Sequence, residues 1–146
     1  MKVGLISCVK SKLNTKSKAK DLYTSTLFTK AYAYAERNYD QIFILSALHG
    51  LLDDEKEIEP YDLTLNTMKQ KERLSWARKV RESVNKKISK DAEIFIHAGW
   101  KYREFLAHNL VFDGYIVNVP LEGLGIGKQL QWYSRQELDK IQLKLM

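Results

Sequence analysis

Two side chains able to take part in acid-base chemistry follow apolar segments of this chain. His49 comes three residues after Gln41–Ser46, and Asp62 follows Pro60-Tyr61. An imidazole can neutralise a departing base, and a carboxylate can orient water or stabilise an oxocarbenium-like centre. We therefore predict catalytic roles for His49 and Asp62 in processing at an N-glycosidic bond, with Tyr61 or Tyr102 as an aromatic face for stacking.

A second group of residues has the chemistry of a base-binding or phosphate-binding site. Lys10 and Lys12 would hold phosphate, because ammonium groups bind phosphate oxygens. The predicted binding residues are Ser7, Cys8, Lys10, Lys12, Ser46, Tyr61, His97, Tyr102, Gly123, Gly125 and Gly127. Alternatively, His49 and His97 are partly buried histidines bonded to backbone carbonyls, and Cys8 is a small apolar residue at a strand end.

The glycines at 123, 125 and 127 precede Lys128 and resemble part of a phosphate loop. Glycine lets backbone N–H groups approach an anion at a helix N-terminus. However, Glu122 and Gln129 depart from the Walker pattern, and Lys128 departs from the dinucleotide fingerprint. A tight turn that passes close to the sheet is the alternative.

The sequence lacks the residue patterns of a catalytic triad and of a metal site. There is no Ser-His-Asp order, no His-x-x-x-His pair and no acidic metal triad, so we expect no metal and no cofactor. The single cysteine cannot form an internal disulfide, and no apolar run reaches the ~20 residues that span a bilayer. With no signal-peptide pattern, these features predict a cytoplasmic protein without a membrane partner.

The charges are unevenly distributed along the chain, whose net charge is +6. Residues 1–20 contain six lysines and no acid, and residues 69–90 contain nine basic and two acidic side chains. Residues 40–62 between them contain seven acids and one lysine. Two basic segments could form a surface that attracts phosphate backbones, or they could be a solvated helix face and a solubilising loop.

Four short apolar segments are typical of buried parallel strands. They are Lys2–Ser7, Gln41–Ser46, Glu93–His97 and Tyr115–Val119. His49-Gly50 supplies a turn after the second segment, and a long acidic loop is expected from there to Pro60.

Segments with helical spacing of apolar residues lie between the strands. Helices are predicted from about Ser25 to Arg37 and from an N-cap at Thr67 through Lys90. A third follows Gly99 and carries His108 late in its length, and a C-terminal helix has Ser134 and Glu137 as a capping box.

Alternation of strands and helices predicts a mostly parallel sheet with helices on both faces. At 146 residues, the chain is expected to form a single three-layer α/β domain, residues 1–146, with a four-stranded sheet. Ligands of such sheets bind beyond the carboxyl ends of the strands, where most of the predicted site residues lie.

Three segments together resemble an uncharacterised family of small bacterial and phage proteins. They are Leu5–Lys12, Leu45–Leu52 leading to Pro60–Leu63, and Gly123–Gly127. The first half of the chain is also distantly similar to the YaaA peroxide-stress DNA-binding proteins, although it has no obvious helix-hairpin-helix insertion. The arrangement is faintly similar to the uracil-DNA glycosylase fold, which implies a site built at strand ends, although the Gly-Gln-Asp-Pro-Tyr-His signature is missing after the first strand.

These observations predict a protein that acts on or binds nucleic acid or nucleobases, with N-glycosidic chemistry as its most concrete form. The alternatives are a non-catalytic DNA- or RNA-binding module, or a binder of small nucleotides that uses the glycine segment. The sequence leaves open the substrate, the strand order and the oligomeric state.

Overall fold

A five-stranded sheet in the order β4-β3-β1-β6-β7 forms the centre of the computed structural model, which describes residues 1–7 and 12–145. Four of its strands are parallel: β1 (Lys2–Ser7), β3 (Gln41–Ser46), β6 (Glu93–His97) and β7 (Ile116–Asn118). Each matches a strand predicted from the sequence. The fold is therefore α/β with a mostly parallel sheet, but the prediction of four strands is wrong, because a fifth, antiparallel strand pairs with β3 at the edge of the sheet.

The expected acidic loop after His49 is wrong, because much of this segment is paired. Residues Gly50–Asp53 form β4, which is antiparallel to β3, and Glu57–Ile58 form β5. Strand β5 pairs with β2 (Ser17–Lys18) in a separate two-stranded sheet. Gly50 has a φ of +70°, which suits glycine at the turn into β4. The segment also buries Leu51 and Leu52, so apolar burial stabilises it despite its acidic composition.

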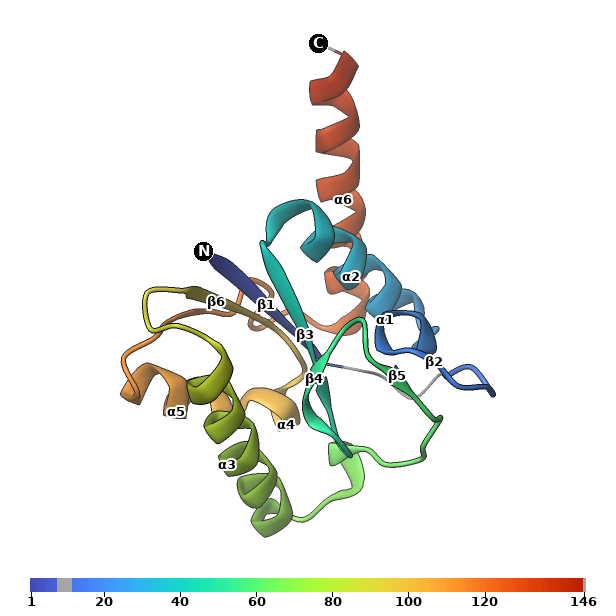
Figure 1. Cartoon of the computed structure of the whole chain (residues 1–146). Coiled ribbons are helices and arrows are strands. Elements are labelled where there is room, and N and C mark those ends of the chain that lie inside the picture. The colour runs from blue at the N-terminus through green and yellow to red at the C-terminus, as the bar shows by residue number, and fades with distance from the viewer. Residues whose placement is uncertain (8–11, 146) are drawn as a thin grey trace.

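Helices cover both faces of the sheet, as Figure 1 shows. One face packs against α2 (Thr26–Asn38) and the first half of α6 (Ile126–Leu145), with the short α1 (Ala19–Leu22) nearby. The other face packs against α3 (Gln70–Lys87), α4 (Trp100–Arg103) and α5 (Leu106–Phe112). Alternate strand residues serve the two faces: Leu5 belongs to the α3 side and Ile6 to the α2 side.

Local side chains explain where two of these helices begin. The Ser25 hydroxyl accepts a hydrogen bond from the Phe28 N–H at 3.1 Å, which caps α2. The predicted cap at Thr67 is wrong, because Thr67 ends the 3-10 helix η1 (Leu65–Thr67). Helix α3 starts after Lys69, whose N–H donates to the Glu72 carboxylate at 3.3 Å.

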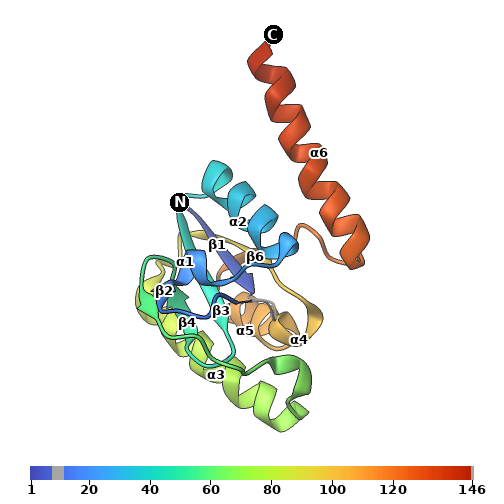
Figure 2. The same cartoon turned by 90° about the vertical axis from the view of Figure 1, so that its right-hand side faces the viewer.

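The predicted capping box at Ser134 and Glu137 is also wrong. Both residues lie inside α6, where the Ser134 hydroxyl accepts a hydrogen bond from Lys30 Nζ at 3.0 Å. Here a capping pattern in the sequence marks a tertiary contact between α6 and α2. Beyond this contact, α6 extends away from the rest of the molecule (Figures 1 and 2).

The order of the strands creates a topological switch point between β1 and β6. From β1 the chain crosses through α2 to β3 on one side of β1. It then returns through α3 to β6 on the other side. The connections therefore diverge at the carboxyl ends of β1 and β6, where open α/β sheets form ligand crevices. Within the described residues, no helix is both long enough and apolar enough to cross a bilayer.

Candidate functional site

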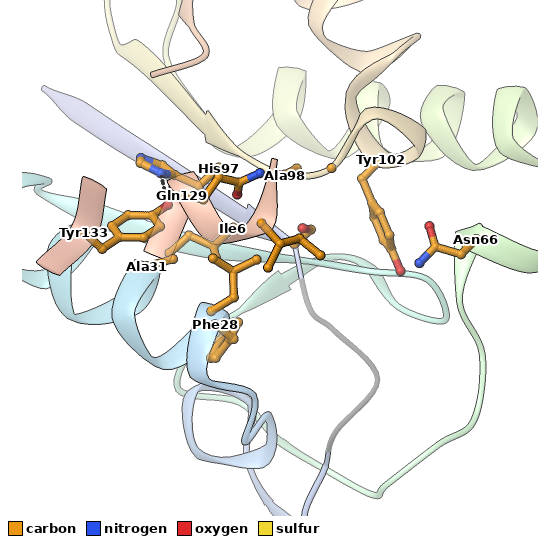
Figure 3. Close-up of a pocket in the computed structure, with 13 residues that line it drawn as sticks. Ile6, Phe28, Ala31, Asn66, His97, Ala98, Tyr102, Gln129 and Tyr133 are labelled. Atoms are coloured by element: carbon orange, nitrogen blue, oxygen red, sulfur yellow. Dashed lines mark hydrogen bonds between the residues drawn. The ribbon is translucent and has the colours of Figure 1, made fainter. Parts of the chain in front are cut away.

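A pocket of about 250 Å³ lies at this switch point. Figure 3 shows it between the ends of β1 and β6, with side chains contributed by helices on either side. Its apolar lining consists of Ile6, Leu27, Phe28, Ala31, Ala98 and Ile126. Its polar lining consists of Ser7, Asn66, His97, Tyr102, Gln129 and Tyr133, with Gly99 adding backbone. We call this space the switch-point pocket.

The apolar wall comes mainly from the first two turns of α2. Phe28 and Ala31 are three residues apart, so both point from the helix toward the sheet. Both are buried, and Phe28 packs against Tyr23 with ring centroids 5.2 Å apart. This wall is thus part of the core and is held in place before any ligand binds.

The polar groups are held by their own hydrogen bonds. Gln129 Nε2 donates to the Leu124 carbonyl at 2.8 Å, which fixes the amide at the start of α6. Lys101 Nζ donates to the Asn66 carbonyl at 2.9 Å and ties η1 to α4. Figure 3 shows the Tyr102 ring and the Asn66 side chain at one end of the pocket and Gln129 at the other.

His97 is buried in the floor of the pocket between two tyrosines. Its Nε2 lies 2.5 Å from the Tyr39 hydroxyl, and its Nδ1 lies 2.7 Å from the Tyr133 hydroxyl. Burial lowers the pKa of the imidazole to about 4, so His97 is neutral at physiological pH. A neutral imidazole has one N–H and one bare nitrogen, so one tyrosine donates to the ring and the other accepts from it. Both ring nitrogens are thereby engaged within the protein.

A second set of predicted residues gathers on the β3 side of β1. The buried Ser46 hydroxyl lies 2.7 Å from the Tyr61 hydroxyl and accepts a bond from the His49 N–H at 3.0 Å. The Tyr61 hydroxyl lies 2.7 Å from the Tyr23 hydroxyl, and Lys12 Nζ lies 4.7 Å from the centre of the Tyr61 ring. We call Lys12, Tyr23, Ser46, His49 and Tyr61 the hydroxyl cluster.

The predicted catalytic pair does not line the switch-point pocket. His49 is exposed, and its ring and that of Tyr61 are nearly perpendicular, with centroids 5.6 Å apart. Partial desolvation of the imidazole, together with the charge of Lys56, lowers the pKa of His49. Asp62 is exposed on the loop after Tyr61.

The remaining predicted binding residues are distributed as follows. Ser7, His97 and Tyr102 line the switch-point pocket, and Gly123 lines a neighbouring cavity. Gly125 precedes α6 and Gly127 lies in its first turn, and no other atom lies within 4 Å of the position of an added Cβ at either glycine. Cys8 and Lys10 lie outside the described residues.

Part of the basic N-terminal segment forms ion pairs with the acidic segment. Lys18 Nζ and Lys20 Nζ lie 3.0 and 2.8 Å from the Glu55 carboxylate. In the second basic segment, Arg73 and Arg81 pair with Glu104 and Asp113, each at 2.5 Å. Several of the predicted phosphate-attracting charges are therefore used within the fold.

Asn66, Gln129 and Tyr133 were not predicted as site residues. They come from η1 and α6, and a loop separates each of these elements from the strand that precedes it in the sequence. The segment Asn66-Thr67 carried only a capping signal, and Gln129 carried only a mismatch to the Walker pattern. Among the described residues, no group of three or more His, Cys, Asp or Glu side chains could hold a metal ion.

Comparison with known proteins gives one assignment. The chain matches a family of unknown function (DUF6884) over residues 3–135, and it belongs to that family. A search of curated proteins and a search of solved structures found no match. These comparisons therefore provide no link to the YaaA proteins or to the uracil-DNA glycosylases.

Proposed function

We propose that this member of the DUF6884 family binds a nucleobase in the switch-point pocket. The observation that carries the proposal is the composition of that pocket, an apolar wall facing amide and hydroxyl groups at a sheet edge. A nucleobase has the matching form, with flat apolar faces and an edge of hydrogen-bond donors and acceptors. Proteins that take up single bases combine apolar stacking with hydrogen bonds to that edge.

The described lining of the pocket is uncharged, which supports a neutral ligand group. No Asp, Glu, Lys or Arg is among the described residues that line the pocket. His97, the titratable group with a pKa near neutrality in ordinary peptides, is held neutral by burial. A carboxylate or phosphate placed there would lose its hydration without an opposite charge, whereas a base would lose much less.

The polar groups at the two ends suit recognition of a base edge. Asn66 and Gln129 each have an amide that can both donate and accept. With about 250 Å³ available, the pocket is smaller than those that hold drug-sized molecules, and it fits a single ring system.

Hydrolysis of an N-glycosidic bond is a further form of this proposal. His49 and Asp62 would have to act from outside the lining of the pocket, so we place binding before catalysis. The resemblance to uracil-DNA glycosylases belongs to the same proposal, because their sites are also built at strand ends. Mass analysis of bound nucleosides tests this step, since released base and free sugar would support hydrolysis.

A substitution in α6 tests the binding site with a matched control. In the wild-type protein, calorimetric titration with nucleosides should detect binding, and free ribose should not bind. Gln129→Ala should weaken nucleoside binding about tenfold, the value of one hydrogen bond to a buried group. Gln131→Ala, which removes an exposed amide two residues further along α6, should leave affinity unchanged. Equal affinity in all three proteins, or no binding of any base, would overturn the proposal.

A nucleic-acid backbone on α3 is the second candidate. Lys71, Arg78, Lys79 and Lys86 are exposed, and the helical period places them along one side of α3. Affinity for oligonucleotides should then fall steeply with salt, and Lys79→Glu should reduce that slope. If the affinity for oligonucleotides depends on neither salt nor this substitution, α3 does not bind a nucleic-acid backbone.

A further inference from the structure

Arg103 differs from the other well-buried arginine that forms an ion pair. The side chains of Arg73 and Arg103 are both 14% exposed. Arg73 bonds through two of its nitrogens, since its Nε lies 2.5 Å from the Glu104 carboxylate and its Nη1 donates to the Met68 carbonyl at 2.7 Å. Within the part of the chain that the structure describes, the Arg103 guanidinium donates through Nε alone, to the Ala98 carbonyl at 3.2 Å.

The terminal nitrogens of Arg103 therefore have donors to spare. Nη1 lies 3.8 Å from a carboxylate oxygen of Glu122, beyond hydrogen-bond distance, and the Glu122 side chain is 68% exposed. No other acceptor among the described residues bonds this guanidinium. The Arg103 guanidinium also lies over the Trp100 ring, with Cζ 5.3 Å from the ring centre, and this cation–π contact restrains its orientation. An arginine held at Nε with free terminal N–H groups has the form of an anion-binding fork.

Arg103 lines a second cavity of about 190 Å³, which we call the arginine cavity. This cavity adjoins the switch-point pocket, because His97, Ala98, Gly99, Gln129 and Tyr133 line both spaces. Figure 3 shows the shared side from within the switch-point pocket, with His97, Ala98, Gln129 and Tyr133 labelled. Among the described residues the linings of the two spaces differ in charge, since that of the first has no Asp, Glu, Lys or Arg and that of the second has the Arg103 guanidinium.

We propose that the arginine cavity takes the phosphate of the ligand whose base occupies the switch-point pocket. The inference rests on the proposed function and makes its substrate class a nucleoside monophosphate. The base lies in the switch-point pocket, and the sugar lies beside Gly99 and Gln129, which line both cavities. The phosphate accepts hydrogen bonds from the terminal nitrogens of Arg103. Glu122 is the group that the phosphate displaces from the guanidinium, and its exposed side chain can turn into solvent.

The test compares nucleosides with their 5′-monophosphates by calorimetric titration. Wild-type protein should bind the monophosphate at least about tenfold more tightly, since a charge-assisted pair adds that much. Arg103→Gln should abolish this preference and leave nucleoside affinity unchanged. Arg135→Gln, at an exposed arginine of α6 that lines neither cavity, is the matched control and should keep the wild-type preference.

Glu122→Gln keeps the test decisive even if Arg103→Gln does not fold. Removing the competing carboxylate should tighten binding of the monophosphate and leave nucleoside affinity unchanged. If wild type binds nucleoside and monophosphate equally, this inference fails and the proposed function stands. A preference that survives in folded Arg103→Gln overturns the inference as well. If neither compound binds, the proposed function itself fails.

Discussion

At the scale of single residues, His97 should make stability depend on pH. Burial lowers its folded-state pKa to about 4, whereas an unfolded chain has a histidine pKa of about 6.5. Between these values the unfolded chain binds a proton that the folded chain does not, so the free energy of unfolding falls as pH falls. The loss across this window is about 3 kcal/mol and ends near the folded-state pKa.

Urea unfolding of wild type and His97→Gln, from about pH 7 to about pH 4, measures this contribution. The glutamine amide can replace a donor and an acceptor between Tyr39 and Tyr133 but does not titrate. The free energy of unfolding of His97→Gln should therefore depend less steeply on pH than that of wild type. Parallel profiles for wild type and His97→Gln would contradict the prediction.

Gly4 is required by the close approach of the Tyr39 ring. A Cβ at position 4 would lie 2.5 Å from Cδ2 of Tyr39. The ring cannot move freely, because it stacks on Phe95 at 4.7 Å and its hydroxyl bonds His97. Gly4→Ala should therefore lower the free energy of unfolding by about 1–3 kcal/mol, as measured by urea denaturation.

Gly127→Ala is the control for Gly4→Ala. No atom lies within 4 Å of an added Cβ there, and the residue is in the first turn of α6. Alanine should leave stability unchanged or raise it by up to about 1 kcal/mol, because glycine is a poor helix former. If both variants were equally stable, the contact with Tyr39 would not explain why position 4 is glycine.

Two of the predicted site residues, Ser7 and His97, are the last residues of β1 and β6, and both line the switch-point pocket. Ser7 and His97 were predictable because the apolar segments before them are clear and parallel strands end at one edge. Asn66 and Gln129 were not, because they reach the same edge from η1 and α6 through tertiary packing. The hydrogen bonds between His97 and the hydroxyls of Tyr39 and Tyr133 could not be predicted either, since both tyrosines are far from His97 in the sequence.

At the scale of elements, period and composition identified the parallel strands and the helices around them. They missed β4, because Gly50–Asp53 is short and its pairing with β3 leaves no periodic signal. They also misplaced two helix caps. Ser134 lies inside α6 and bonds Lys30, and α3 begins after Lys69 instead of at Thr67. Caps are chosen among several polar candidates by tertiary contacts, which the local pattern does not contain.

The last turns of α6 should contribute little to folding stability. Leu138, Leu143 and Leu145 are 62%, 72% and 82% exposed, so their side chains bury little area. Removal of residues 138–146 should change the free energy of unfolding by less than about 0.5 kcal/mol. A cut before Tyr133, which is buried and bonds His97, should instead destabilise the protein strongly. Circular dichroism during urea denaturation distinguishes the two truncations.

At the scale of the whole molecule, the strand order divides the predicted site into two places. β1 lies at the centre, with β6 on one side and β3 on the other. Residues that follow β1 and β6 meet in the switch-point pocket, whereas Ser46 and His49 meet Tyr61 in the hydroxyl cluster. Strand order depends on contacts between distant segments, so the sequence alone predicted one edge but not this division.

A ligand in the switch-point pocket should join the two helical layers. The pocket takes side chains from α2 and α6 on one face and from η1 and α4 on the other. Saturation with a nucleoside at 100 times Kd should raise the free energy of unfolding by about 2.7 kcal/mol. Hydrogen exchange should slow in η1, α4 and the first two turns of α6, because local opening there would release the ligand. Residues 138–145 of the same helix contact none of this site and should exchange at an unchanged rate, so uniform slowing along α6 would contradict binding at the pocket.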